Sequence, residues 1–332
     1  MKLKALTRII TLFLALVVLL ALASCGAPKV DAELEIKVSV LNGTTGFGMA
    51  KLINDSVAGN AALNYTFSVE TDATLITAGL IKGEIDIAAL PTNAASTIYN
   101  KTEGGVQVLA INTLGVLYVV ENGNTISTLS DLEGKTVYCP AQNPAFIFEA
   151  ICKKAGVNVT VDTQYAQPAA LMSAVASATE PMIAVLPEPV LTIATNKNPN
   201  LRVALDLTEE WNTAIGSSSL VQGCIVARTE FVEAHKNEID KFLEEYAASI
   251  AFLGEDVDAA AKAVVTAGIY TNPQGEEAAI AIVKKAIPKC NVAFLAGDEL
   301  KASLSEFLSV MHEIAPASVG GKLPLDNFYY KK

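Results

Sequence analysis

The sequence predicts an α/β protein of two lobes, each a mostly parallel β-sheet flanked by helices. Apolar runs of strand length alternate with amphipathic segments of helix length, a pattern typical of sheets that carry helices on both faces. The pattern occurs first over 35–91 and again over 129–189, and two such blocks indicate two lobes. Long amphipathic helices after residue 228 indicate that the chain returns to the first lobe.

The first block alternates strands and helices in a regular order. The apolar run 35–43 predicts a strand that ends in a turn, and 66–72 and 84–91 predict two more strands. Between them, 46–59 has one apolar face and predicts a helix, and 72–83 predicts a second helix that ends at Gly83.

The second block repeats this alternation. It predicts a turn and strand over 129–140, a helix over 146–156, a short strand over 161–166, a helix over 167–179 and a buried strand over 181–189. A long helix then follows over about 231–253, with apolar residues at helical spacing. The chain is expected to cross between lobes near 113–119 and near 220–226.

The N-terminus carries an export signal. Three basic residues precede the uncharged run Ile9–Leu22, which is too short to span a bilayer as a helix. The following "LASC" resembles the lipobox of bacterial lipoproteins, which implies cleavage before Cys25 and lipidation of Cys25. The alternative is an ordinary secretory signal that contains a cysteine. We therefore expect a signal peptide over 1–24, a lipid-anchored tether over 25–35, lobe 1 over 36–115 and 225–332, and lobe 2 over 116–224.

Charge and composition exclude some functions. Residues 1–24 contain three basic and no acidic residues, so their removal changes the formal net charge from −11 to −14. So acidic a chain is a poor candidate for binding nucleic acid. No later segment has the length of a membrane span, so the rest of the chain is expected to be soluble and outside the membrane.

Four cysteines remain after Cys25, and their spacing leaves two alternatives open. Two disulfides are one, and scattered small core residues are the other; the four are Cys139, Cys152, Cys224 and Cys290. Neither cysteines nor histidines cluster, so no metal site is predicted.

Polar residues follow the predicted strands of the first lobe at the edge where open α/β sheets bind ligands. They lie in "NGTTGFG", "ETDA" and "LPTN", and each is either a ligand-binding residue or a plain helix cap. The candidates are Thr44, Thr45, Thr71, Asp72, Pro91, Thr92 and Asn93, together with Gly115 at the first crossing.

The second lobe offers Gln142 and Asn143 at a helix start and Glu188 in "LPEP". Ser217 and Ser218, before the return crossing, are further candidates. Phe47 and Trp211 either stack on a planar ligand or belong to the core. The candidate turns hold no Arg or Lys, which favours a neutral, zwitterionic or singly charged ligand.

No catalytic arrangement is recognisable. "EGKT" has Leu129 where a phosphate-binding loop needs its first glycine, and the two histidines, His235 and His312, lie in charged helical segments. We therefore expect a protein that is not an enzyme and that needs no cofactor.

Several segments in order carry a family resemblance. "KGEIDIAALPTNAAS", "LSDLEGKTV", "AVLPEPVLT", "VARTEFVEAHKNEIDKFLEEY" and "GKLPLDNFYY" together resemble the solute-binding lipoproteins of ABC importers of the nitrate, sulfonate and taurine (NMT1/THI5-like) type. The resemblance covers about residue 36 to the end and implies a type II periplasmic-binding-protein fold. It also implies a small-molecule ligand bound between the lobes, an ABC permease as partner and a monomer on the outer face of the cell membrane.

Two other functions and several ligands stay open. The same fold serves relatives that act as enzymes on thiamine or menaquinone precursors, and an exported enzyme is one alternative. A sensory or partner-binding protein is the other. Sulfonates, nitrate, a thiamine-precursor pyrimidine and riboflavin are all compatible with polar turns of this composition. The sequence also fits an envelope of one membrane or two.

Overall fold

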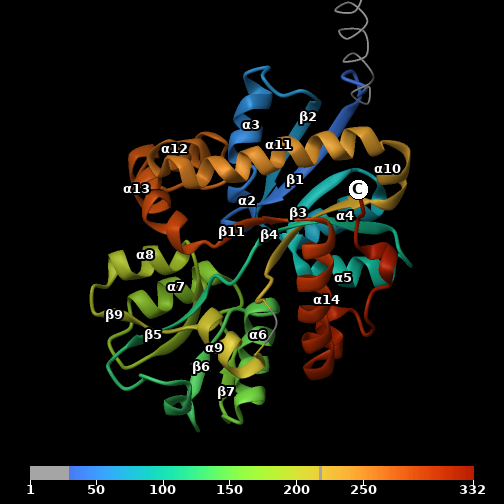
Figure 1. Cartoon of the computed structure of the whole chain (residues 1–332). Coiled ribbons are helices and arrows are strands. Elements are labelled where there is room, and N and C mark those ends of the chain that lie inside the picture. Colours follow the sequence, from blue (N-terminus) through green and yellow to red (C-terminus); the bar gives the residue numbers. More distant parts are fainter. Residues whose placement is uncertain (1–29, 217–218) are drawn as a thin grey trace, which may run out of the picture.

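The computed structural model describes residues 30–216 and 219–332 and has two α/β lobes (Figure 1). Lobe 1 contains a six-stranded sheet of order β11-β4-β10-β3-β1-β2, and lobe 2 a five-stranded sheet of order β7-β6-β8-β5-β9. The predicted two-lobed α/β class is therefore confirmed. The expected signal peptide, the lipidated Cys25, and Ser217 and Ser218 lie outside the described residues.

Strands are present in all six ranges predicted from the apolar runs, and the structure adds five that were not predicted: β4, β5, β9, β10 and β11. Those of lobe 1 are β1 (Glu35–Leu41), β2 (Asn64–Glu70), β3 (Ile87–Pro91), β4 (Val106–Thr113), β10 (Gly223–Arg228) and β11 (Val292–Leu295). Those of lobe 2 are β5 (Leu117–Asn122), β6 (Thr136–Tyr138), β7 (Thr160–Asp162), β8 (Ile183–Pro187) and β9 (Leu201–Asp206).

Both sheets are mixed, whereas the sequence predicted mostly parallel ones. In lobe 1 only β1–β2 and β1–β3 are parallel pairs, because β10 enters from lobe 2 and runs antiparallel to both β3 and β4. In lobe 2, β5 comes from lobe 1 and is antiparallel to β8 and β9. The crossings between lobes thus account for most of the antiparallel pairs.

Helices cover the faces of both sheets. Lobe 1 carries α2 (Thr44–Phe47), α3 (Ala50–Val57), α4 (Ala73–Lys82), α5 (Thr92–Lys101), α10 (Thr229–Ala234), α11 (Lys236–Glu255), α12 (Val257–Thr266), α13 (Glu276–Ala286) and α14 (Gly297–Ile314). Lobe 2 carries α6 (Asn143–Ala155), α7 (Pro168–Ala176), α8 (Val190–Lys197) and α9 (Leu207–Ile215). Short 3₁₀ turns are η1 (Leu129–Leu132), η2 (Ile287–Lys289), η3 (Pro316–Val319) and η4 (Asp326–Phe328).

The helix predicted over 46–59 is two helices, and this prediction was wrong. The chain begins α2 at Thr44 and breaks before α3. A β-carbon on Gly48 would lie only 2.8 Å from the Tyr246 hydroxyl, so α11 packs directly on the backbone there. Glycine is also a poor helix former, which favours a break at this close contact.

The two crossings form a hydrogen-bonded hinge. The first crossing, 114–116, joins β4 to β5, and the second joins α9 to β10. The Gln222 backbone N–H donates to the Thr113 carbonyl at 3.0 Å, and the Gln222 side-chain Oε1 accepts from the Val116 N–H at 2.6 Å. Gln222 is buried, so it links the two crossing segments where solvent does not compete.

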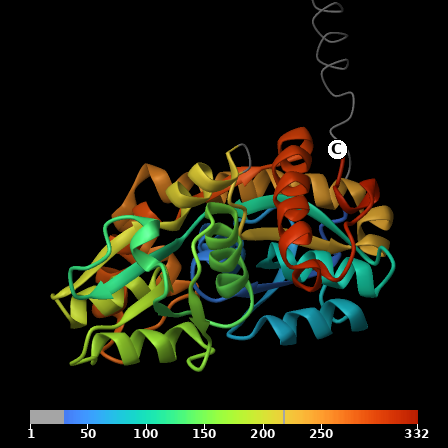
Figure 2. The same ribbon diagram turned by 90° about the horizontal axis from the view of Figure 1, so that it is seen from below.

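Helix α14 packs on both lobes. It lies against β4 of lobe 1 and against α6 of lobe 2 (Figures 1 and 2). The Trp211 ring of α9 and the Phe307 ring of α14 have centroids 5.4 Å apart. One continuous cluster of buried apolar residues therefore runs from Leu90 and Val108 in lobe 1 to Val119 in lobe 2.

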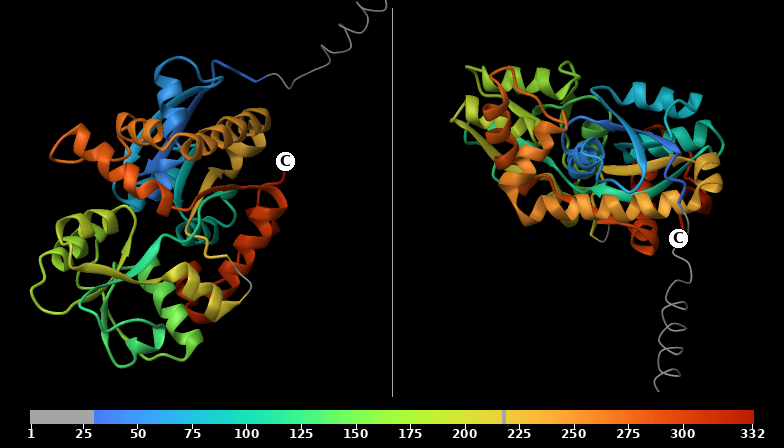
Figure 3. Two further views of the ribbon diagram at one scale, coloured as in Figure 1. Left: turned by 60° about the vertical axis from the view of Figure 1, so that its left-hand side comes forward. Right: turned by 90° about the horizontal axis from the view of Figure 1, so that it is seen from above.

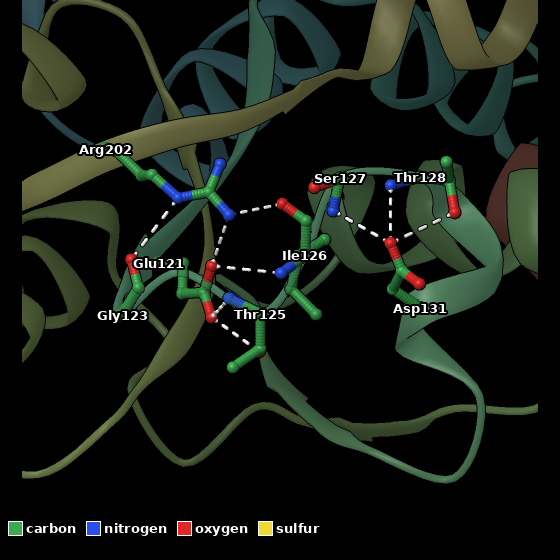
Figure 4. Close-up of polar contacts among 8 residues, drawn as sticks. All are labelled: Glu121, Gly123, Thr125, Ile126, Ser127, Thr128, Asp131 and Arg202. Carbon is green, nitrogen blue, oxygen red and sulfur yellow. Dashed lines mark hydrogen bonds and ion pairs between the residues drawn. The ribbon is translucent and has the colours of Figure 1, made fainter.

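A buried ion pair anchors a loop of lobe 2 (Figure 4). The Glu121 carboxylate, 1% exposed, pairs with Arg202 at 2.7 Å and accepts hydrogen bonds from Thr125 and from the Ile126 N–H. Burial opposes the charge, but the hydrogen bonds and the Arg202 guanidinium outweigh it and hold the pKa of Glu121 below its usual range.

Candidate ligand site at the lobe junction

The lobes meet where α2 of lobe 1 faces the turn between β8 and α8 of lobe 2. Thr44, the first residue of α2, is buried, and its hydroxyl donates to the Glu188 carbonyl at 2.8 Å. The same hydroxyl lies 3.7 Å from the Cys290 sulfur. Two residues predicted for the site from opposite lobes, Thr44 and Glu188, are thus in direct contact.

Glu188 is the buried carboxylate of this junction, with 2% of its surface exposed. It accepts hydrogen bonds from the Thr192 N–H at 3.2 Å and from the Thr192 hydroxyl at 3.1 Å, and it lies 3.9 Å from the Lys289 ammonium. Burial raises the pKa of Glu188 and outweighs these contacts, which lower it. The junction therefore holds an acid whose proton is bound more tightly than that of an exposed glutamate.

The segment 285–291 of lobe 1 closes the junction from the other side. Sequence reasoning missed this segment. The Tyr118 hydroxyl of lobe 2 donates to the Lys289 carbonyl at 3.3 Å, and Lys285 donates to Asn196 of α8 at 3.1 Å. Figure 3, left, shows α7 and α8 of lobe 2 below the orange α13, which leads into this segment. The only sequence signal for it was Cys290, and a lone cysteine does not indicate a ligand site.

The same segment also touches the hinge. Asn291 Nδ2 donates to the Gly115 carbonyl at 2.5 Å, and the Asn291 carbonyl accepts from the Leu114 N–H at 3.0 Å. A β-carbon on Gly115 would lie 2.1 Å from the Thr208 hydroxyl oxygen, so any larger residue there requires Thr208 to shift. Gly115 is thus part of the hinge, at the edge of the junction.

Thr92 belongs to the hinge as well. Its hydroxyl donates to the Val221 carbonyl at 2.9 Å, and its N–H donates to the Gln222 carbonyl at 3.2 Å. Pro91 directly precedes it as the N-cap of α5, and Asn93 follows, half-buried, in the first turn. The hydroxyl of Thr92 is therefore engaged with the second crossing.

The start of α6 in lobe 2 has an unsatisfied polar atom. Gln142 is exposed with a φ of 64°, and no side chain caps the helix. Asn143 is only 8% exposed, yet its Oδ1 has no hydrogen-bond partner among the described residues. The hydroxyl of Thr208, beside Gly115, is also without a partner there. Buried polar atoms of this kind are rare and are often satisfied by a ligand or by water.

The other candidates lie elsewhere or serve other roles. Asp72 is exposed and accepts a hydrogen bond from the Thr74 N–H at 2.8 Å, so it caps the helix α4. Thr71 beside it is also exposed. Thr45 is half-buried, and its carbonyl accepts from Asn112 at 2.9 Å. Phe47 and Trp211 are fully buried, so the structure favours the core alternative for both.

The remaining expectations concern disulfides, a metal site and a membrane-spanning helix. The four cysteines are buried and free, so they are core residues and do not form two disulfides. No cluster of three or more His, Cys, Asp or Glu residues suited to a metal occurs within 30–216 and 219–332. In the same part of the chain, no helix is both long and apolar enough to cross a membrane.

We expect that Thr44→Val increases the reactivity of Cys290 toward a thiol reagent about fivefold, because loss of one hydrogen bond of about 1 kcal/mol favours separation of the lobes by that factor. The measurement is the labelling rate of each cysteine by mass spectrometry. Cys139 and Cys152, buried within the shared core away from this contact, provide the internal control. An equal increase at all sites would mean general loosening and would contradict a role in lobe closure.

Comparison with known proteins decides the family. A family model described as menaquinone biosynthesis matches residues 61–313, which is most of the chain. The chain belongs to this family. No curated protein matches the sequence. The solved structures that resemble this chain are described in other terms.

Those solved structures share the fold of this family member. An ABC transporter protein from Parabacteroides distasonis is 23% identical with a TM-score of 0.75, over 91% of this chain and all of that one. The periplasmic aliphatic sulphonate binding protein SsuA from Escherichia coli is 12% identical with a TM-score of 0.69, over 90% of this chain and 92% of that one. These likenesses establish a periplasmic-binding-protein fold.

The family corrects one prediction from the sequence. We expected a protein that is not an enzyme, because no catalytic arrangement was recognisable. That prediction is contradicted, since the family is described by a biosynthetic process. Sequence reasoning looked for catalytic motifs among residues close together in the chain. It did not find the contacts of Tyr118 and Glu188 with Lys289, which form only in the folded junction.

Proposed function

We propose that this protein captures a small organic or anionic solute between its two lobes, outside the cytoplasm, and delivers it to the permease of an ABC importer. The observation that carries the proposal is the pair of crossing segments, which Gln222 ties to each other and beside which Thr44 of one lobe contacts Glu188 of the other. Such a hinge permits closure on a ligand. The fold shared with binding proteins of ABC systems supports the same function.

The ligand is expected to contact the junction and the start of α6. Lys289 is the cation that pairs with Glu188, at 3.9 Å. A dianion would need further cations, so a neutral, zwitterionic or singly charged solute fits better. The unpartnered Oδ1 of Asn143 favours a ligand that offers a hydrogen-bond donor.

We further propose that Cys25 carries lipid and anchors the protein to the outer face of the membrane. The lipobox-like "LASC" after a basic and then apolar segment supports this. The mass of the N-terminal peptide from membrane-purified protein tests it directly. An unmodified Cys25, or cleavage at another site, would rule the anchor out.

A saturating ligand is expected to stabilise the protein by about 2.7 kcal/mol at 100 times its dissociation constant, seen as a rise in Tm of several degrees. The panel contains sulfonates, nitrate, thiamine precursors, flavins, amino acids, aromatic acids and naphthoquinone precursors. Asn143→Ala should weaken binding of the active compound about tenfold, through loss of one buried hydrogen bond. Asp72→Ala, at an exposed helix cap, is the matched control and should leave binding unchanged.

A second candidate function is catalysis of a step in menaquinone biosynthesis, which the family match favours. Glu188 is the junction's best candidate for acid–base chemistry, because it is a buried carboxyl whose pKa is raised by that burial. Incubation with the aromatic acids and naphthoquinone precursors, followed by mass spectrometry of the mixture, distinguishes the two functions. A product whose formation is lost in Glu188→Gln, with binding retained, would establish catalysis; binding without product would establish capture.

A further inference from the structure

A shallow hollow of about 420 Å³ lies on lobe 1 at the corner where α11 begins. Its lining includes Glu233 of α10, Lys236 of α11 and residues of the C-terminal segment: Asp326, Tyr329, Tyr330 and Lys331. Figure 1 shows this corner, where the C-terminus lies beside α10. None of these residues belongs to the junction site.

Two lysines, Lys236 and Lys331, line the hollow. The Lys236 nitrogen lies 5.3 Å from the centre of the Tyr330 ring and 3.5 Å from the Lys331 carbonyl, so it is held over the hollow. Among residues 30–216 and 219–332, neither Lys236 nor Lys331 forms an ion pair, whereas Lys301 nearby pairs with Asp326 at 3.0 Å. Two lysines that form no ion pair, beside the N-terminal end of a 20-residue helix that no side chain caps, suit a phosphate group.

The hollow also presents an uncommitted carboxylate. Glu233 is exposed and makes no ion pair or hydrogen bond within the described part of the chain. A purely anionic ligand would meet this charge unfavourably, and Asp326 adds a second carboxylate that Lys301 already neutralises. A ligand with both a phosphate and an amine matches the cations and the free carboxylate together.

The position of the hollow relative to the expected anchor points to a membrane source for such a ligand. The Asp31 N–H donates to Glu238 in the first turn of α11 at 2.7 Å, so the chain enters lobe 1 beside the hollow. Val30 lies five positions after Cys25, and a fully extended chain of that length spans at most about 18 Å. A lipid on Cys25 would therefore keep this corner close to the bilayer.

We propose that the hollow binds the headgroup of a zwitterionic phospholipid of the phosphoethanolamine type, with the phosphate between Lys236 and Lys331 and the amine at Glu233. The membrane location rests on the proposed lipid anchor. A headgroup without net charge also avoids the repulsion that an anionic surface exerts on a chain of this acidity. Binding would fix the orientation of lobe 1 on the membrane.

The first experiment tests the hollow without the membrane. The full chain, purified from membranes in a phosphate-free detergent, is titrated with glycerophosphoethanolamine and with glycerophosphoglycerol and followed by ³¹P NMR. We expect saturable binding of the first compound, at least about tenfold weaker in Lys236→Gln and unchanged in Lys241→Gln, a control on the same helix outside the hollow. No binding, equal binding of both compounds, or equal binding by Lys236→Gln would overturn the site.

The second experiment tests the membrane as the source. The same protein is placed in nanodiscs of phosphatidylethanolamine or of phosphatidylglycerol, and hydrogen exchange is measured over 229–238 and 326–332. We expect slower exchange in phosphatidylethanolamine, lost in Lys236→Gln. Equal exchange in both lipids, after binding in the first experiment, would overturn the lipid occupant in favour of a soluble zwitterion. The mass of the Cys25 peptide is determined in parallel, so that failure of the anchor is recognised separately.

Discussion

Replacement of Arg202 with methionine is expected to lower the free energy of unfolding by about 3 kcal/mol, because it leaves the buried Glu121 carboxylate without its cation. This is the lower end of the range for broken buried pairs, since Arg202 itself is about a third exposed. Urea unfolding followed by the fluorescence of the single tryptophan, Trp211, measures the change. Lys197→Met, at an exposed lysine of α8, is the matched control and should change stability by less than about 0.5 kcal/mol.

The pH dependence of this difference has a definite sign. The folded-state pKa of Glu121 is lowered, so the stabilisation from its charge is present above the unfolded pKa of about 4.3 and is lost as the pH falls through the folded value. The difference between the parent protein and Arg202→Met should therefore be constant near pH 7 and shrink below about pH 4. A difference that persisted in acid would mean that Arg202 stabilises the loop by packing alone.

The second large effect is expected at the hinge. Gly115→Ala places a β-carbon 2.1 Å from the Thr208 hydroxyl oxygen and 3.0 Å from Leu220, so it should lower the free energy of unfolding by about 2–3 kcal/mol and reduce ligand affinity. The Thr208 hydroxyl has no hydrogen-bond partner among the described residues, so Thr208→Ala alone should cost little. The double variant Gly115→Ala/Thr208→Ala should recover most of the loss.

Gly254→Ala is the control for this experiment. Gly254 lies in α11 with open space around its α-carbon, so the substitution should stabilise the protein by about 0.5–1 kcal/mol. Two-state urea denaturation measures all four variants. Failure of Thr208→Ala to rescue Gly115→Ala would show that the clash is not the cause of the instability.

Part of the candidate site could be predicted because it depends on local patterns. Alternation of apolar and polar segments located β1 and β8, and the polar residues that follow these strands, Thr44 and Glu188, do meet in the structure. The rule that ligands bind at the carboxyl ends of strands needs only strand positions, not pairing.

The rest of the site could not be predicted, because it depends on contacts between distant segments. Tyr118 and Lys289 are 171 positions apart, and neither lies in a motif that indicates the other. The engagement of the Thr92 hydroxyl by Val221 likewise depends on where the second crossing runs. The antiparallel strands escaped prediction for the same reason, since strand direction is set by the crossings and leaves no trace in periodicity.

The helix α14 has a consequence for cooperativity. Its apolar face joins Phe307 of lobe 1 to Trp211 of lobe 2, so the core does not divide where the sheets divide. Unfolding one lobe would expose apolar residues of the other lobe that belong to the shared core, and we infer that both lobes melt in a single transition. If the lobes close on a ligand as proposed, the units that move and the unit that folds are therefore different: two lobes move, and one cooperative unit unfolds.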